Sequence, residues 1–141
     1  MAVTATPIFP QTPQCASIQI TAANTARDGS GVINTVCTIG ANGGYVKRLT
    51  FKSCQATAAA TSAMVGKFWY STDGGTTWRA IRTGEIAIPT VTASTTAIGA
   101  EQSIPFADGL QLPANAKVGA TITVRAGVQD NMEACAEWAD Y

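Results

Sequence analysis

The stretch AMVGKFWYSTDGGTTWRAIR, residues 63–82, decides the fold class. Two runs rich in aromatic and β-branched residues flank the polar segment 71–76, and Asp73 with the two glycines after it lies at the centre of that segment. An Asp-Gly pair between such runs is typical of a tight β-hairpin turn, because glycine adopts positive φ at little cost. The stretch therefore predicts two antiparallel strands, over residues 63–70 and 77–88, joined by this turn.

Short alternating or β-branched runs fill most of the remaining chain, and clusters of Gly, Asn and Asp separate them at the spacing of an all-β sandwich or barrel. Residues 55–62 are small and Ala-rich and are expected to form a loop. The last run alternates alanines and Trp138 with acids, which favours a strand, although Glu and Ala also suit a helix. Besides the hairpin, strands are expected over residues 17–21, 32–39, 45–54, 98–106, 110–113, 120–129 and 133–141, with turns at Asn42-Gly43, Asp108-Gly109 and Asp130-Asn131.

These runs amount to about eight strands with no long helix and no internal repeat. An antiparallel two-sheet sandwich of jelly-roll type is expected, because eight strands in two Greek keys close a core and leave few edges. At 141 residues the chain suits one domain. We expect that domain over residues 15–141, after an extended N-terminal arm over residues 1–14.

The arm contains Pro7, Pro10 and Pro13 and shows no periodicity. Proline fixes its own φ and pushes the preceding residue out of the helical region, so an extended conformation is expected. Two interpretations stay open: a frayed terminus, or a strap that lies on a neighbouring subunit with Ile8 and Phe9 as its anchors.

Charge argues against two classes of partner. Nine Lys and Arg balance nine Asp and Glu, so the chain has no net field to attract nucleic acid or an anionic membrane. The signs are unevenly spread: residues 1–82 hold seven basic and two acidic groups (+5), and residues 83–141 hold two basic and seven acidic groups (−5). Either the fold separates these halves into two charged faces, or interleaved strands mix them.

The residue types argue against catalysis and bound cofactors. The chain has no histidine, which excludes Ser–His and Cys–His catalysis and makes a metal site hard to build. Carboxylates are the remaining acid–base groups, and Asp28, Asp73 and Asp108 each precede a glycine, as Asp does in structural turns. Glu133 and Glu137 are the other candidates. No phosphate-binding loop is present. We expect no enzyme activity, no metal and no cofactor.

The four cysteines, Cys15, Cys37, Cys54 and Cys135, are widely spaced and lack the CxxC pattern of zinc and redox sites. Most are expected to act as small buried hydrophobic residues, and one disulfide formed after release into an oxidising medium stays open. The first residues carry neither a basic segment nor an apolar run, and no apolar run approaches the roughly 20 residues of a membrane span, so folding in a cytoplasm is expected.

Aromatic and basic residues surround the predicted turn. Trp69, Tyr70 and Trp78 bracket Asp73, and they either stabilise the sheet as cross-strand pairs or form an exposed platform that stacks on sugar rings or on bases. Arg79 and Arg82 follow, and arginine suits planar carboxylates at subunit interfaces.

Residues 69–79, WYSTDGGTTWR, resemble a hairpin of small structural proteins of tailed bacteriophages. The segments GANGGYVKRL (40–49) and GLQLPA (109–114) and the acidic terminus ending in Asp140-Tyr141 fit the same resemblance. It implies a jelly-roll capsid cement (decoration) protein that sits as a trimer on the outer capsid surface of the virion. The implied partner is the major capsid protein.

We therefore expect a non-enzymatic virion protein, assembled in the bacterial host cytoplasm, whose trimers bridge capsomers and resist internal DNA pressure. Two alternatives remain: a receptor- or glycan-binding module of a tail fibre or spike, and a tail-tube or head–tail connector subunit that forms rings. The residues expected to contact the capsid are Ile8 and Phe9, those expected at subunit contacts are Arg79, Arg82, Glu133 and Glu137, and those on the possible ligand-facing hairpin are Trp69, Tyr70, Asp73 and Trp78.

Overall fold

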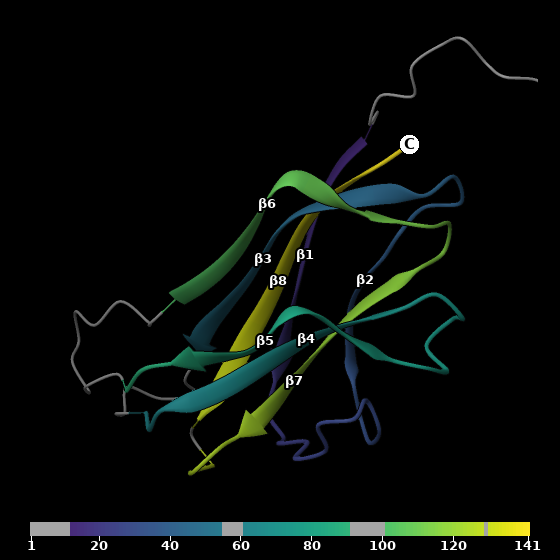
Figure 1. Ribbon diagram of the computed structural model, residues 1–141. Coiled ribbons are helices and arrows are strands. Elements are labelled where there is room, and N and C mark those ends of the chain that lie inside the picture. Colours follow the sequence, from purple (N-terminus) through teal and green to yellow (C-terminus); the bar gives the residue numbers. More distant parts are fainter. Residues whose placement is uncertain (1–11, 55–60, 91–100, 129) are drawn as a thin grey trace, which may run out of the picture.

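The computed structural model describes residues 12–54, 61–90, 101–128 and 130–141, with only the backbone described at residues 82–84. The described chain contains strands and no helix (Figure 1). Accordingly, no helix there is long and apolar enough to cross a membrane. The strands are β1 (Thr12–Ile20), β2 (Asn34–Thr38), β3 (Gly44–Cys54), β4 (Met64–Ser71), β5 (Arg79–Ile88), β6 (Glu101–Leu112), β7 (Lys117–Val124) and β8 (Asn131–Asp140).

The strands form two four-stranded sheets that lie one behind the other (Figure 1). One sheet has the order β1-β8-β3-β6 and the other has the order β2-β7-β4-β5. All pairs within the sheets are antiparallel, and they are nested: the first strand pairs with the eighth, the second with the seventh, the third with the sixth and the fourth with the fifth. The expected all-β antiparallel two-sheet sandwich is confirmed.

The core lies between the two sheets. Phe51 on β3 stacks against Phe68 on β4, with ring centroids 4.0 Å apart. Gly66 faces the same space, and a Cβ there would lie 2.6 Å from the Phe51 ring and 2.8 Å from the Met132 sulfur. Only glycine lets the two sheets approach this closely at that point.

The hairpin predicted around Asp73 is confirmed. β4 and β5 are antiparallel, with Tyr70 opposite Arg79 and Trp69 opposite Ala80. Both turn glycines have positive φ, 76° at Gly74 and 97° at Gly75, which explains why the turn needs glycine at these places.

The last three residues predicted for the N-terminal arm, 12–14, lie in the first strand. Thr12, Pro13 and Gln14 pair with Asp140, Ala139 and Trp138, so the first strand begins before residue 15. β1 is an edge strand, where a proline need not donate a ladder hydrogen bond. The rest of the arm, including Ile8 and Phe9, lies outside the described residues, as does most of the loop expected over residues 55–62.

The turn predicted at Asp108-Gly109 is also wrong, because β6 runs through it as one strand. Val46 on β3 pairs with Leu110 and Arg48 pairs with Pro105, so the four residues between them on β6 bulge out opposite Lys47. Gly109 has a φ of 73°, and the Tyr45 ring lies where its Cβ would be. A glycine with positive φ occurs in β-bulges as well as in turns, and the two can be told apart only from the pairing with the neighbouring strand.

Lys47 forms a bulge against β8 as well, since Val46 pairs with Trp138 and Arg48 with Glu137. The bulge breaks the simple alternation expected along β3, and Val46 and Leu49 are both fully buried. At the C-terminus, Asn131–Asp140 forms strand β8, so the strand prediction is confirmed and the helix alternative is wrong.

The two oppositely charged halves of the sequence are interleaved. β8, from the acidic half, lies between β1 and β3 from the basic half. The fold therefore does not separate the two halves of the sequence into two oppositely charged faces. It places acidic and basic strands side by side in one sheet.

Candidate interaction surfaces

The sandwich has two outer faces, and they differ in what lies on them. The covered face is the outer face of the sheet β2-β7-β4-β5. The open face is the outer face of the sheet β1-β8-β3-β6. Outward positions are identified by register: Phe68, Leu49 and Ala136 point into the core, so their neighbours Trp69, Arg48 and Glu137 point outward.

Trp69 lies on the covered face, yet it is only 1% exposed. Its indole Nε1 donates a hydrogen bond to Thr121 Oγ1 at 2.9 Å. The Lys67 ammonium lies 4.5 Å from the Trp69 ring centroid and donates to the Arg27 carbonyl at 3.1 Å. A cation over an aromatic ring is an attractive contact. Trp69 is thus enclosed by its own chain.

The segment that covers this face is the β1–β2 loop, residues 21–33. The Asn24 amide N–H donates to the Ile122 carbonyl at 2.8 Å, and the Asn24 side chain donates to the Ser30 and Val32 carbonyls at 2.9 and 3.0 Å. Arg27 forms an ion pair with Glu85 on β5, with Nε and Oε1 3.1 Å apart. Asn24 and Arg27 therefore tie the loop to the sheet, and the Asn24 side chain holds the later part of the loop in place.

Trp78 also packs on the covered face. Gly119 on β7 is the register partner of Trp69, and a Cβ on Gly119 would lie 2.5 Å from Ile33 Cγ2 and 2.8 Å from Trp78 Cζ3. The Trp78 ring and the Ile33 side chain therefore pack directly on the Gly119 backbone. A Cβ on Gly29 of the β1–β2 loop would lie 2.4 Å from the Trp78 carbonyl oxygen, so loop and hairpin also touch.

These positions contradict the exposed aromatic platform. Trp69 is buried, Tyr70 is half-buried against the core, and Trp78 is half-buried on the sheet. Trp78 also lies outside the paired strands, opposite neither Trp69 nor Tyr70. The alternative in which the aromatics stabilise the sheet agrees with this geometry, although the contact is with Gly119 and the β1–β2 loop and not between cross-strand rings.

Asp73 organises the turn. Its Oδ1 accepts hydrogen bonds from the Thr77 amide at 2.9 Å, the Ser71 hydroxyl at 2.7 Å and the Thr76 amide at 3.1 Å. These donors, the Thr77 amide first and the Ser71 hydroxyl next, hold the pKa of Asp73 well below its usual range. The carboxylate satisfies turn amides and has a structural role.

The open face carries two adjacent columns of opposite charge. Glu137 pairs with Arg48 and Glu133 pairs with Lys52 across the β8–β3 ladder, so each acid lies beside a base at the same height. Between these pairs lie Cys135 and Thr50. From one end to the other, the β8 column is Glu133, Cys135 and Glu137, and the β3 column is Lys52, Thr50 and Arg48.

These charges are only loosely satisfied within the chain. The Arg48 Nε and Glu137 Oε2 atoms are 3.9 Å apart, and the two side chains are 47% and 41% exposed. At this exposure an ion pair adds little stability. Lys52 and Glu133 form no ion pair within the described part of the chain. The columns and Glu101 line a shallow hollow of about 290 Å³.

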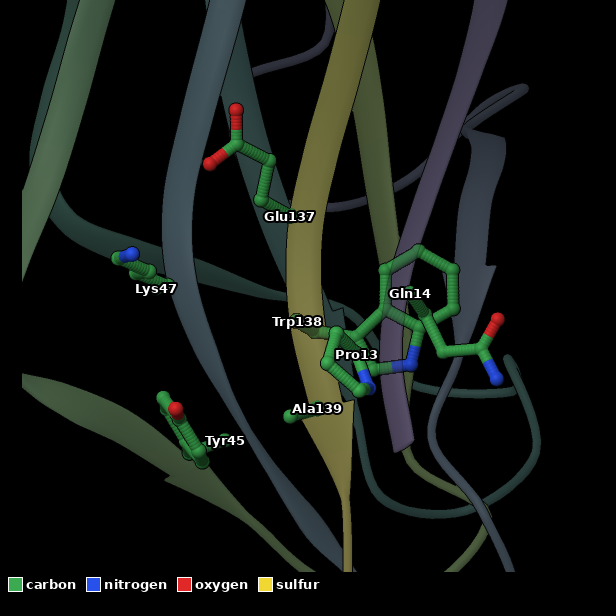
Figure 2. Close-up of a pocket in the computed structure, with 7 residues that line it drawn as sticks. All are labelled: Pro13, Gln14, Tyr45, Lys47, Glu137, Trp138 and Ala139. Carbon is green, nitrogen blue, oxygen red and sulfur yellow. The ribbon is translucent and has the colours of Figure 1, made fainter. Parts of the chain in front are cut away.

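A second hollow, of about 490 Å³, continues the open face toward the start of β1 (Figure 2). In Figure 2, Tyr45 and Lys47 come from β3, Glu137 and Ala139 from β8, and Pro13 from β1 on the far side of β8. The full lining is Pro13, Gln14, Tyr45, Lys47, Glu137, Trp138 and Ala139. This part of the face is more apolar than the charged columns beside it.

The cysteines are all free, and only Cys37 is buried. Burial raises the pKa of the Cys37 thiol to about 12. Cys15 and Cys135 lie on the open face with their sulfur atoms 3.9 Å apart. Burial and then the Cys15 thiol raise the pKa of Cys135 to about 11. The burial predicted for the cysteines in strand-like stretches is therefore confirmed for Cys37, whereas Cys54 and Cys135 are only half-buried, and Cys15 is exposed.

The structure separates the four residues predicted at subunit contacts. Glu133 and Glu137 lie together on the open face, while Arg79 is exposed on β5 in the other sheet. Arg82 is also on β5, where only its backbone is described. Sequence reasoning missed Arg48 and Lys52 as partners of the glutamates, because the bulge at Lys47 and the β3–β8 pairing are not visible in the local pattern.

No group of three or more His, Cys, Asp and Glu side chains that could hold a metal ion occurs among residues 12–54, 61–90, 101–128 and 130–141.

Comparison with known proteins gives little. No protein-family model and no curated protein matches the chain. Among solved structures, the chain is similar to one described as "Cyanophage Pam1 capsid asymmetric unit", with a TM-score of 0.45 and 15% sequence identity over 100% of this chain and 94% of that chain. At these values the likeness carries no conclusion about function, and the fold rests on the strand pairing itself.

Proposed function

We propose that this chain is a non-enzymatic structural protein of a tailed-phage virion, and specifically a capsid cement protein on the outside of the head. Its copies bind the major capsid protein and one another, with a trimer as the assembly that the resemblance implies. The site of action is the surface of the sandwich, and no chemical step is involved.

The observation that carries this proposal is the strand order of the two sheets that contain the Asp73 hairpin. The resemblance to phage structural proteins rests on residues 69–79 and implies a jelly roll. The nested strand order, in which β1 pairs with β8 and β4 pairs with β5, supports a jelly roll of two Greek keys. This architecture recurs in viral capsid domains.

The surfaces support binding by many modest contacts. The open face is polar and charged, and its charges are weakly engaged within the chain. Contacts of this kind are individually weak, but many copies on one shell act together, so that detachment requires breaking several contacts at once. Bridging between capsomers adds contact area that opposes outward pressure from packaged DNA.

The residues fall into three groups under this proposal. Ile8 and Phe9 anchor the chain to the shell, Arg79 and Arg82 on β5 contact a neighbouring copy within the trimer, and Glu133 and Glu137 serve a separate contact on the other sheet. The burial of Trp69 removes the feature that favoured a glycan-binding hairpin, and no specific observation favours a connector ring.

The experiment is cryo-electron microscopy of purified particles that contain this chain, with its presence verified by mass spectrometry. Density for the eight-stranded sandwich outside the head shell is expected. Density in the tail or at the head–tail junction would contradict the cement role.

The role of the arm is tested on expanded shells with a variant that lacks residues 2–11, which leaves β1 intact. Loss of Ile8 and Phe9 is expected to lower occupancy on the shell while the circular dichroism spectrum of the sandwich is retained. Unchanged occupancy would remove the arm from the capsid contact.

A further inference from the structure

We propose that the open face binds the open face of a second copy of this chain, across a two-fold axis parallel to the strands and midway between β8 and β3. This goes beyond the cement role, because it assigns a surface, a partner and a symmetry that hold whatever shell the protein covers. The proposed contact lies on the sheet that contains β3 and β8, whereas Arg79 and Arg82 lie on β5 in the other sheet. It is therefore independent of a trimer contact through those arginines.

The charge columns are complementary to themselves under this symmetry. A half-turn about the axis places β3 of the second copy on β8 of the first, and β8 of the second on β3 of the first. Arg48 and Glu137 are register partners within one copy, so after the half-turn Arg48 meets Glu137 of the second copy. Lys52 meets Glu133 in the same way. Such an isologous contact makes each pair twice.

The geometry suits two facing sheets. A two-fold axis along the strands keeps the strands of both copies nearly parallel, which is the aligned class of sheet-on-sheet packing. The middle of each column is small and uncharged, with Thr50 beside Cys135. The central strip of the contact is therefore uncharged, and the pairs of opposite charge lie at its two ends.

The columns also discriminate against other partners. A partner with one sign of charge would be attracted by one column and repelled by the column next to it, only one strand spacing away. A partner must therefore present acidic and basic columns in the reverse order. A second copy does so by symmetry alone, whereas an extended acidic or basic ligand does not.

The charges are available for such a contact. Arg48 and Lys52 are exposed, Glu133 and Glu137 are half-buried, and the one ion pair among them is 3.9 Å long. No segment of the described chain lies over these columns, whereas the other outer face is covered by residues 21–33. The open face thus retains exposed charge that a partner can neutralise.

The test uses two charge-reversed variants of the full chain. The acidic variant is Arg48→Glu with Lys52→Glu, and the basic variant is Glu133→Lys with Glu137→Arg. Sedimentation equilibrium measures self-association of each variant, of the native chain and of an equimolar mixture of the two variants. Lys117→Glu on β7, in the other sheet, is the control, and circular dichroism with thermal melting verifies that each variant is folded.

The native chain is expected to form a dimer whose affinity falls between 0.1 and 1 M salt, because salt screens exposed charges. Each reversed variant is expected to associate with itself about tenfold or more weakly than the native chain, because four attractive pairs become repulsive. The mixture is expected to form a heterodimer with affinity near the native value. The Lys117→Glu control is expected to associate as the native chain does.

Three results would overturn the proposal. The first is a native chain that stays monomeric at all concentrations tested. The second is a mixture that associates no better than either variant alone. The third is a loss confined to the basic variant, because that would assign Glu133 and Glu137 to a head-to-tail contact with basic residues such as Arg79 and Arg82. None of these outcomes bears on whether the protein is found on a virion.

Discussion

The two outer faces of the sandwich differ in how much of their side-chain surface the chain itself covers. On the covered face, Trp69 is buried beneath Lys67 and the β1–β2 loop, and Trp78 seals the sheet at Gly119. On the open face, the sheet presents adjacent columns of opposite charge, and among the described residues the columns are joined by a single ion pair, Arg48–Glu137, of 3.9 Å. The difference indicates that the first face contributes to stability and the second is available for partners.

The largest expected effect is on the covered face. Trp69→Ala removes a fully buried indole together with its hydrogen bond to Thr121, and it is expected to lower the free energy of unfolding by about 3–5 kcal/mol. Urea denaturation measures it. Lys52→Ala on the open face is the control, with an expected change within about 0.5 kcal/mol. Equal effects of the two substitutions would remove the distinction between the faces.

Gly119→Ala tests the packing of Trp78 on the same face. The new methyl group would lie within 3.0 Å of the Trp78 ring and within 2.5 Å of Ile33, so one of them must move. A loss of about 1–3 kcal/mol is expected, as for other overpacked sites. A shift of tryptophan fluorescence should accompany it. If the Gly119→Ala variant has the native stability and an unchanged fluorescence spectrum, Trp78 does not pack on Gly119.

Asp73→Asn tests the turn between the two strands of the covered face. The Asp73 pKa is lower in the folded chain than in the unfolded chain, so its contribution to stability is present above the ordinary Asp pKa of about 4 and is lost as the pH falls through the folded value. The native melting temperature should therefore fall more steeply than that of the variant as the pH drops below about 4. Parallel curves would contradict this role of the carboxylate.

The smallest expected effect belongs to the open face. Glu137→Gln removes the ion pair with Arg48, but both groups are more than a third exposed, so the change in stability of the monomer should be under about 0.5 kcal/mol. Urea denaturation at low protein concentration measures it. A loss above 2 kcal/mol would mean that the open face is part of the structural framework after all.

The sequence predicted most of what local chemistry determines. The Asp73 hairpin, the antiparallel sandwich and the strand at the C-terminus are confirmed, because turn residues and alternation encode them directly. The turn at Asp108-Gly109 was mispredicted for a related reason, since a positive-φ glycine looks the same in a turn and in a bulge.

The candidate site depended on contacts that are distant in sequence. Glu133 and Glu137 were recognised, but their basic neighbours Arg48 and Lys52 lie on a strand more than 80 residues earlier in the chain. The burial of Trp69 likewise depends on the β1–β2 loop, which contacts it through Lys67, and no local pattern in the sequence shows where that loop lies on the sheet. Register and loop docking are tertiary properties, and no local pattern contains them.

The division between the faces is tested most directly by the reactivity of Cys15, an exposed thiol on the open face. Its rate of alkylation is followed by mass spectrometry as the protein concentration rises, with the buried Cys37 as an internal reference. The rate at Cys15 is predicted to fall as copies associate through the open face, and to recover in 1 M salt, which screens the charges that hold them together. A rate that stays constant while the native chain sediments as a dimer would show that the copies meet through another surface.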